Sequence, residues 1–143
     1  MLIESNLLLA ALANEGLLRA VIKLGDADYN TPRADWLLGE FEGWFRDALR
    51  RLGIEAYVDE AGDCDDYADL YAVLARVCHR RMPKCAGTAL PVGVLHYRTS
   101  AGNGHAINVA LTSDRGLLYI EPQTGKTVTL TAEEKRSAWL LKF

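Results

Sequence analysis

The sequence predicts an α+β domain in which N-terminal helices pack on an antiparallel β-sheet. Two observations lead to this prediction. Apolar residues recur at helical spacing in the first half of the chain, and the second half changes to short β-branched or alternating runs. Turn-forming Gly, Asn, Asp and Ser residues separate these later runs. A chain of 143 residues is long enough for a hydrophobic core, so we expect a single domain over residues 1–143.

Three segments of the first half are predicted to be helical from their apolar spacing. The first covers residues 6–24, where Asn6 can cap the N-terminus and Gly25 can end the helix. The third covers residues 64–80, and Pro83 prevents its continuation. Between them lies a helix whose apolar stripe is typical of a buried core: Leu37, Phe41, Trp44, Phe45, Ala48 and Leu52.

The second half predicts a sheet together with one short helical turn. The β-branched or alternating runs are residues 92–98, 105–111, 117–121, 127–130 and 139–143. Thr131 and Glu134 have the spacing of a capping box, which predicts the start of a helix. The connections that precede the sheet are expected to be a polar loop at 25–32 and a short extended piece at 54–58.

The composition excludes several classes of protein. A formal net charge of −3 argues against electrostatic binding of nucleic acid, and no apolar stretch approaches the roughly 20 residues of a membrane-spanning helix. Glu4, rather than a basic residue, precedes the apolar run at 7–13, which argues against a secretion signal. Cys64, Cys78 and Cys85 are an odd number of thiols and suit a reducing compartment. We therefore expect a cytoplasmic protein, of a size that suits a bacterial or phage genome.

Three short motifs supply a thiol, an imidazole and a carboxylate, in that order along the chain. Cys64 lies in Asp-Cys-Asp-Asp-Tyr-Ala, His105 in Gly-His-Ala-Ile-Asn-Val, and Glu121 in Tyr-Ile-Glu-Pro-Gln. Cys64 would open a helix, whose N-terminal dipole favours the thiolate, whereas the negative charges of Asp63 and its acidic neighbours oppose it. The pattern predicts a cysteine nucleophile, a histidine base and a carboxylate that orients the histidine.

The predicted hairpin decides whether the imidazole and the carboxylate meet. His105 begins one strand, and Glu121 ends the next strand along the chain. If the numbers of paired residues sum to an even value, the two side chains project from the same face of neighbouring strands and can form a hydrogen bond. A slip of one residue would place them on opposite faces of the sheet.

The three motifs resemble those of the papain-like protease domain at the C-terminus of fungal agglutinins of the fairy-ring mushroom type, and of the transglutaminase-like branch of the same superfamily. The resemblance covers residues 30–143 and leaves the first helix, within residues 1–25, outside it. It implies a papain-like fold, with Cys64 as nucleophile, His105 as general base and Glu121 as orienting acid. It does not extend to a sugar-binding domain and therefore implies no lectin activity.

One position departs from the papain-like pattern. In these enzymes a Gln lies six residues before the Cys and helps to bind the oxyanion, but here that spacing falls on Val58, which has no side-chain donor. Three other residues are candidates for this role: Gln123, Tyr57 and Trp36. Gln123 is preferred because it lies two residues beyond Glu121, on the same face of the strand if the extended backbone continues.

The leading functional hypothesis is a cysteine-dependent amide hydrolase that acts on a peptide or protein through a thioester on Cys64. A protease, a peptidase, a deamidase and a transglutaminase-like acyltransferase all fit this description. The resemblance also implies a calcium site, for which Asp65 and Asp66 offer oxygen ligands; no other cofactor is expected. The alternative is a non-catalytic papain-like module that binds a peptide or protein. A third hypothesis is a structural protein whose acidic loop becomes ordered on binding calcium.

Overall fold

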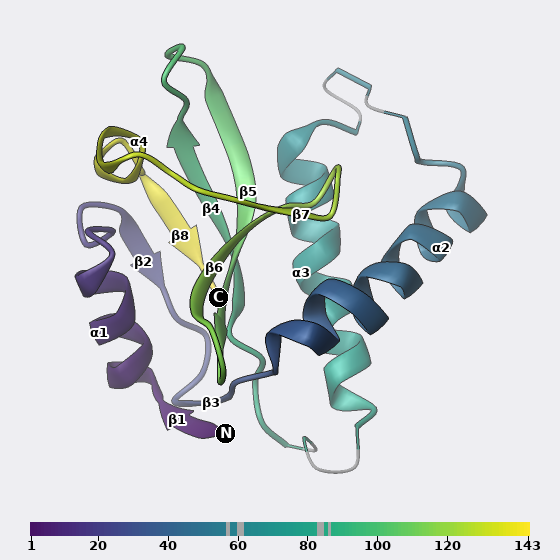
Figure 1. Ribbon diagram of the computed structural model, residues 1–143, viewed down its shortest axis with the longest axis horizontal. Coiled ribbons are helices and arrows are strands. Elements are labelled where there is room, and N and C mark those ends of the chain that lie inside the picture. The colour runs from purple at the N-terminus through teal and green to yellow at the C-terminus, as the bar shows by residue number, and fades with distance from the viewer. Residues whose placement is uncertain (57, 60–61, 83–84, 86) are drawn as a thin grey trace.

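The chain forms one six-stranded sheet with helices on both faces, and a separate two-stranded sheet (Figure 1). The computed structural model describes residues 1–56, 58–59, 62–82, 85 and 87–143. Its helices are α1 (Ser5–Asn14), the π-helix η1 (Trp36–Phe41), α2 (Glu42–Leu52), α3 (Cys64–Arg80) and α4 (Ala132–Arg136). Its strands are β1 (Leu2–Glu4), β2 (Val21–Lys23), β3 (Asp28–Asn30), β4 (Val92–Arg98), β5 (Gly104–Thr112), β6 (Gly116–Glu121), β7 (Lys126–Val128) and β8 (Leu140–Lys142).

The larger sheet is mixed, so the prediction of an antiparallel sheet is wrong. Its strand order is β2-β8-β4-β5-β6-β7, and every pair is antiparallel except β2 with β8. The parallel pair arises because β2, from the N-terminal part of the chain, lies along the C-terminal strand β8, with Val21 opposite Leu140. Strands β1 and β3 form the smaller antiparallel sheet, and β3 lies within the segment 25–32 that was predicted as a loop.

The first helix is shorter than predicted. It ends at Asn14 because Gly16 has φ +80°, a left-handed conformation that costs glycine little, and Leu17 donates a closing hydrogen bond of 3.0 Å to the Leu12 carbonyl. The chain then extends, and the β-branched Val21 and Ile22 pair with the edge of the sheet. The apolar run was read as one helix, although its second part is a strand.

Helices cover both faces of the larger sheet, rather than one (Figure 1). Leu8 and Leu12 of α1 are buried against one face of the sheet, in a hydrophobic cluster that includes Ile107 and Val109 of β5. Tyr71 of α3 belongs to the cluster on the other face, together with η1 and α2. Successive β5 residues alternate between the two clusters because side chains of a strand point to opposite faces in turn. The sheet is therefore the middle layer, and both of its faces are buried.

Several other predicted elements are confirmed. Helix α3 and strand β4 have the predicted bounds, and Thr131 and Glu134 form a capping box at the start of α4. The helix predicted around the aromatic stripe is present as η1 followed by α2. Its last residue is Leu52, and Gly53 follows in a left-handed conformation with φ +68°.

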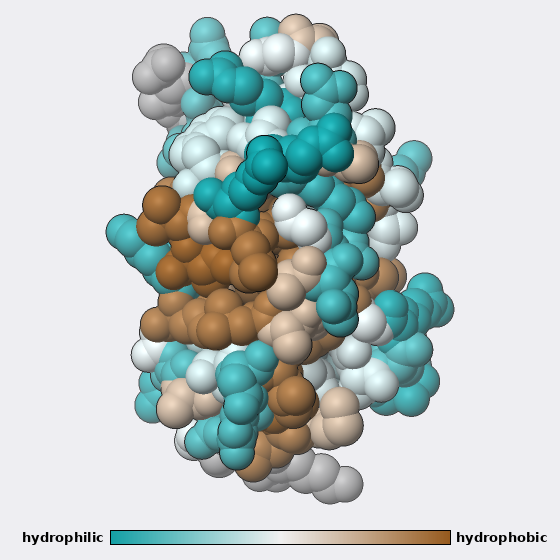
Figure 2. All heavy atoms as spheres, turned by 90° about the vertical axis from the view of Figure 1, so that its left-hand side faces the viewer, coloured by the Kyte–Doolittle hydropathy of each residue, from teal (hydrophilic) through white to brown (hydrophobic). Residues whose placement is uncertain are grey.

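The N-terminal region leaves much apolar surface exposed, as Figure 2 shows from the α1 side. Only two residues of α1 are buried, although most of the helix is apolar. The exposed large apolar side chains before residue 22 are Met1, Leu2, Leu7, Leu9, Leu18 and Val21. Among the described residues, no helix is both long and apolar enough to cross a membrane.

Candidate functional site

His105 and Glu121 meet at one end of the sheet. Strands β5 and β6 pair Asn108 with Ile120 and Val109 with Tyr119, an even register that makes His105 and Glu121 diagonal neighbours on one face. The His105 Nε2 atom lies 2.7 Å from Glu121 Oε2, and 23% and 17% of the two side chains remain exposed. A partly exposed His–Glu pair offers both a hydrogen-bond donor and acceptors to a ligand.

Helix α2 supports this pair from outside the sheet. Arg46 donates hydrogen bonds to the carbonyls of Pro122 and Gln123, the latter at 3.0 Å, and it forms an ion pair with Glu42. The Gln123 backbone N–H in turn donates to Glu121 Oε1 at 3.2 Å. Arg46 thus fixes the turn that carries the carboxylate. No sequence pattern indicates this role, because it depends on the contact between α2 and the β6–β7 turn.

Cys64 lies at the first position of α3, as the sequence predicts, but the structure does not favour its thiolate. Burial raises the pKa of the Cys64 thiol, and the charges of Asp63 and Asp65 raise it further. A hydrogen bond from the Ala106 backbone acts in the opposite direction but does not reverse the shift. Among the described residues, no hydrogen bond joins the Cys64 sulfur to the His105 ring. At neutral pH the sulfur therefore stays a thiol.

The acidic residues around Cys64 are arranged differently from the predicted calcium pair. The carboxyls of Asp63 and Asp65 share a hydrogen bond, which lowers the pKa of Asp63 and raises the pKa of Asp65. Their oxygens and the Cys64 sulfur lie within 4.8 Å of one another. Asp66, the second predicted ligand, is outside this trio. Calcium binding by Asp65 and Asp66 stays a prediction.

An exposed aromatic side chain lies beside the start of β5. Trp139 is 44% exposed, and its ring carbon Cη2 would lie 3.6 Å from a Cβ atom at Gly104, the residue next to His105. The Arg98 guanidinium lies 5.9 Å from the indole centroid, and the His96 ring lies at the same distance. The sequence analysis assigned Trp139 only to the last strand. Its exposure depends on how β8 pairs with β4, which the sequence does not show.

Of the three candidates for an oxyanion donor, Trp36 lies away from Cys64. Trp36 packs on Phe41 and on His79, near the opposite end of α3 from Cys64. Gln123 is attached to the Glu121 carboxylate through its backbone, as described above. Tyr57 lies outside the described residues.

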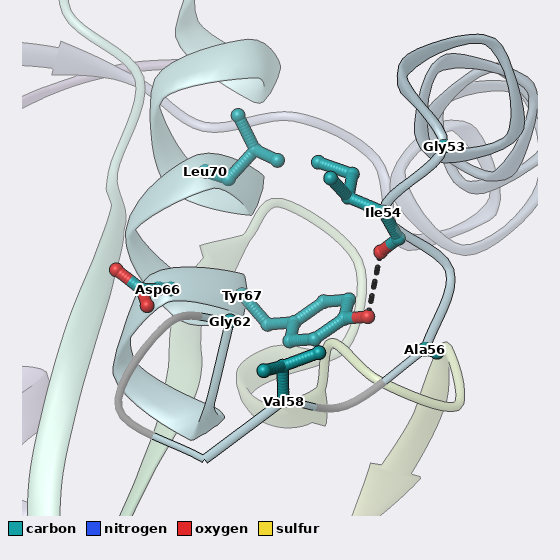
Figure 3. A pocket seen from close by; sticks show the side chains of 8 residues that line it. All are labelled: Gly53, Ile54, Ala56, Val58, Gly62, Asp66, Tyr67 and Leu70. Atoms are coloured by element: carbon teal, nitrogen blue, oxygen red, sulfur yellow. Dashed lines mark hydrogen bonds between the residues drawn. The ribbon is translucent and has the colours of Figure 1, made fainter.

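A cavity of about 510 Å³ lies beside the first turns of α3 (Figure 3). Its walls come from the segment after α2 and from α3 itself: Gly53, Ile54, Ala56, Val58, Gly62, Asp66, Tyr67 and Leu70. The Tyr67 hydroxyl donates a hydrogen bond of 2.7 Å to the Ile54 carbonyl and so holds the two walls together. The described residues of the predicted extended piece at 54–58 lie in this wall, and Val58 forms an isolated bridge with Gly62.

Comparison with solved structures identifies proteins of the same fold. A chain described as a PSL1a–E64 complex matches with a TM-score of 0.73 and 20% sequence identity, over 99% of this chain and 50% of that one. Polyporus squamosus lectin, bound to the human-type influenza-binding epitope Neu5Acα2-6Galβ1-4GlcNAc, matches with a TM-score of 0.75 and 19% identity, over 99% of this chain and 49% of that one. This chain therefore spans about half the length of the chains that it matches. No protein-family model and no curated protein matches it.

These matches correct the family and the activity predicted from the three motifs. One solved structure is described as a complex with E64, and the other is described as a lectin bound to a glycan. The predicted papain-like fold, made of N-terminal helices on an antiparallel sheet, also differs from the observed mixed sheet with helices on both faces. The prediction of a cysteine-dependent hydrolase is likewise withdrawn, and the raised pKa of Cys64 agrees with this correction. The chain shares the fold of about half of a lectin chain.

Proposed function

We propose that this protein is a non-catalytic binding module, and that its ligand is an acidic glycan. The ligand would lie across the end of the sheet where β5 begins, with Trp139 beside Gly104 on one face and the His105–Glu121 pair on the other. The observation that carries this proposal is the exposed Trp139 indole beside Gly104, with the Arg98 guanidinium 5.9 Å from its centroid, one residue along β5 from the partly exposed His–Glu pair. Ligand sites typically combine an apolar or aromatic surface, which the ligand packs on, with a few polar groups that fix the orientation of the ligand.

Each group at this site has a matching group on a sugar. The Trp139 ring can pack on the C–H face of a pyranose, and the His105–Glu121 pair can donate to and accept from hydroxyl groups. Arg98 has no carboxylate partner among the described residues and lies beside the indole. Its planar guanidinium can pair with a carboxylate, such as that of a sialic acid.

The comparison supports the choice of ligand without deciding it. The glycan bound by the Polyporus squamosus lectin contains Neu5Ac, an acidic sugar, and that lectin shares the fold of this chain. This chain is 19% identical to that lectin and spans about half of its length, so glycan binding is known for the longer protein and is proposed for this chain. A peptide or protein ligand, as predicted from the sequence, is the alternative if the titration below shows no glycan binding.

The test is a titration of the isotope-labelled protein with Neu5Acα2-6Galβ1-4GlcNAc, followed by NMR. We expect saturable shifts of the Trp139 indole and of His105. Trp139→Ala should weaken binding at least tenfold, because most of the apolar contact is lost. Trp44→Ala is the matched control: Trp44 is 41% exposed on α2, and its replacement should leave the affinity unchanged. No shift in the wild type, or equal losses in both variants, would overturn the glycan site.

A second measurement tests the absence of catalysis. The protein is incubated with a mixture of peptides, and separately with E64, and both samples are examined by mass spectrometry. New peptide termini that require Cys64, or a mass increase at Cys64 in the presence of E64, would overturn the non-catalytic proposal. Cys64→Ala distinguishes such activity from a contaminant, because the variant would lack it while keeping glycan affinity.

A further inference from the structure

A second cavity, of about 530 Å³, lies at the opposite end of α3 from Cys64. It is lined by Trp36 of η1, by His79 and Met82 near the end of α3, and by Asn30, the last residue of β3, with residues 31–33 after it. With 1.5 Å of rise per residue, His79 lies roughly 22 Å along the helix from Cys64, so this cavity is separate from the proposed glycan site. Its volume is within the range of cavities that hold small organic ligands.

His79 is the titratable side chain in the wall of this cavity. Only 2% of the residue is exposed, and its ring has no hydrogen-bond partner among the described residues. Burial lowers the pKa of His79, so the ring is neutral at pH 7 and keeps one N–H donor and one acceptor nitrogen. A ligand in the cavity could therefore form a hydrogen bond with the His79 ring.

The other groups around this cavity are already engaged. The Thr31 hydroxyl donates to the Met1 carbonyl at 2.9 Å, and the Asn30 amide donates to the Cys85 sulfur at 3.6 Å. Arg33, at the mouth, pairs with Asp35 at 3.1 Å and with Asp114 at 3.6 Å. Arg33 therefore offers no free charge at the mouth, and the N-terminal ammonium is held by the Asn30 side-chain oxygen at 3.0 Å and the Thr31 carbonyl at 3.1 Å. The remaining wall is the apolar surface of Trp36 and Met82, with the His79 ring edge-on to the indole at 6.4 Å.

We infer that this cavity binds a small, uncharged aromatic molecule that carries one hydroxyl or ring N–H group, which forms a hydrogen bond with His79. The aromatic part packs on Trp36 and Met82. The single polar group distinguishes this ligand from a plain hydrocarbon. This inference does not depend on the proposed glycan site.

Two probes of nearly equal size test the inference: 4-methylphenol and toluene. The labelled protein is titrated with each, and the indole N–H signal of Trp36 is followed by NMR, with the Trp139 signal as an internal reference. We expect saturable shifts of Trp36 only, and an affinity for 4-methylphenol about five- to tenfold higher than for toluene, the effect of one hydrogen bond. No shift of Trp36 with either probe, or equal affinities for the two, would overturn the inference.

Variants distinguish the contribution of the His79 hydrogen bond from that of the space available in the cavity. His79→Leu should retain toluene and lose the preference for 4-methylphenol, whereas His96→Leu, at a histidine outside the cavity, should retain the preference. If His79→Leu does not fold, Met82→Trp provides the independent check, because its larger side chain fills the cavity and should abolish binding of both probes. Full affinity in Met82→Trp would place the probes elsewhere and overturn the inference.

Discussion

At the scale of single residues, Cys64 shows how environment decides reactivity. Its position at the start of a 17-residue helix was expected to favour the thiolate. Burial acts against the charged form, and the charges of Asp63 and Asp65 act in the same direction. The helix terminus was visible in the sequence, whereas the burial was not.

We predict that Cys64 behaves as a slow thiol towards iodoacetamide. Because its pKa is raised, alkylation should be negligible at pH 6 and should accelerate only above about pH 8.5, where ordinary thiols ionise. Site-resolved mass spectrometry across this pH range measures the rate. Asp65→Asn should accelerate the reaction, since it removes one of the charges that raise the pKa. Rapid alkylation at mildly acidic pH that disappears in His105→Ala would contradict the prediction.

At the scale of elements, Arg46 joins α2 to the turn after β6. Arg46→Met removes hydrogen bonds from a charged group to two carbonyls and leaves the half-buried Glu42 without its counter-ion. We expect the free energy of unfolding to fall by about 2–3 kcal/mol. Urea denaturation of Arg46→Met measures this loss.

The matched control for Arg46 lies one turn further along the same helix. Arg50 pairs with Asp47, but both side chains are more than half exposed. Arg50→Met should therefore change the free energy of unfolding by less than about 0.5 kcal/mol. Equal effects of the two substitutions would show that the contact with the turn contributes nothing specific.

Replacing either of two glycines of the α2 region by alanine should change the stability of the protein, in opposite directions. Gly53 has φ +68° at the end of the helix, so Gly53→Ala should destabilise the protein by about 1 kcal/mol. Gly43 lies within α2, and a Cβ atom there would meet nothing within 4 Å, so Gly43→Ala should stabilise by up to about 1 kcal/mol. Thermal melting of both variants checks the difference in sign, and the same sign for both would contradict the assignment of the helix end.

At the scale of the whole molecule, Asn108 connects the helical layer to the sheet. The residue is fully buried, and its amide nitrogen donates to the carbonyls of Ala68 in α3 at 2.8 Å and of Gly93 in β4 at 3.1 Å. These two hydrogen bonds tie α3 to β4 through β5, while the Asn108 Oδ1 atom is buried without a partner among the described residues.

We predict that Asn108→Ala lowers the free energy of unfolding by about 2–3 kcal/mol, because two hydrogen bonds are lost in the interior. Asn108→Asp should cost more, since a carboxylate would face two carbonyl oxygens without a donor. The folded variant would hold its proton more tightly than the unfolded chain. Its stability should therefore fall as pH rises from about 4 towards the folded pKa. Urea denaturation between pH 4 and pH 8 measures both effects, and a variant whose stability does not change with pH would contradict them.

Much of the local structure could be predicted from residue patterns. The bounds of α3 and β4 follow from apolar spacing, and the capping box at the start of α4 follows from Thr131 and Glu134. Strand β2 was missed, because its residues continue an apolar run that begins in α1. Only pairing with β8, more than a hundred residues later in the chain, makes this segment a strand.

Some residues of the candidate site could also be predicted from the sequence, and others could not. The sequence named His105 and Glu121, and the even register that would bring them together was stated as a condition. It did not identify Trp139, Arg98 or Arg46, because their contributions depend on contacts between elements that are distant in the chain. Side-chain exposure and the direction of the Cys64 pKa shift are likewise properties of the packed structure.

By itself, the sequence determined where most helices and strands begin and end, because capping, turn chemistry and apolar period act over a few residues. It also determined which side chains with a thiol, an imidazole or a carboxylate are present. The tertiary structure alone decided that the sheet is mixed, that both its faces are buried, that His105 and Glu121 pair, and that burial raises the pKa of Cys64. These features depend on burial and on long-range pairing, which no local pattern encodes.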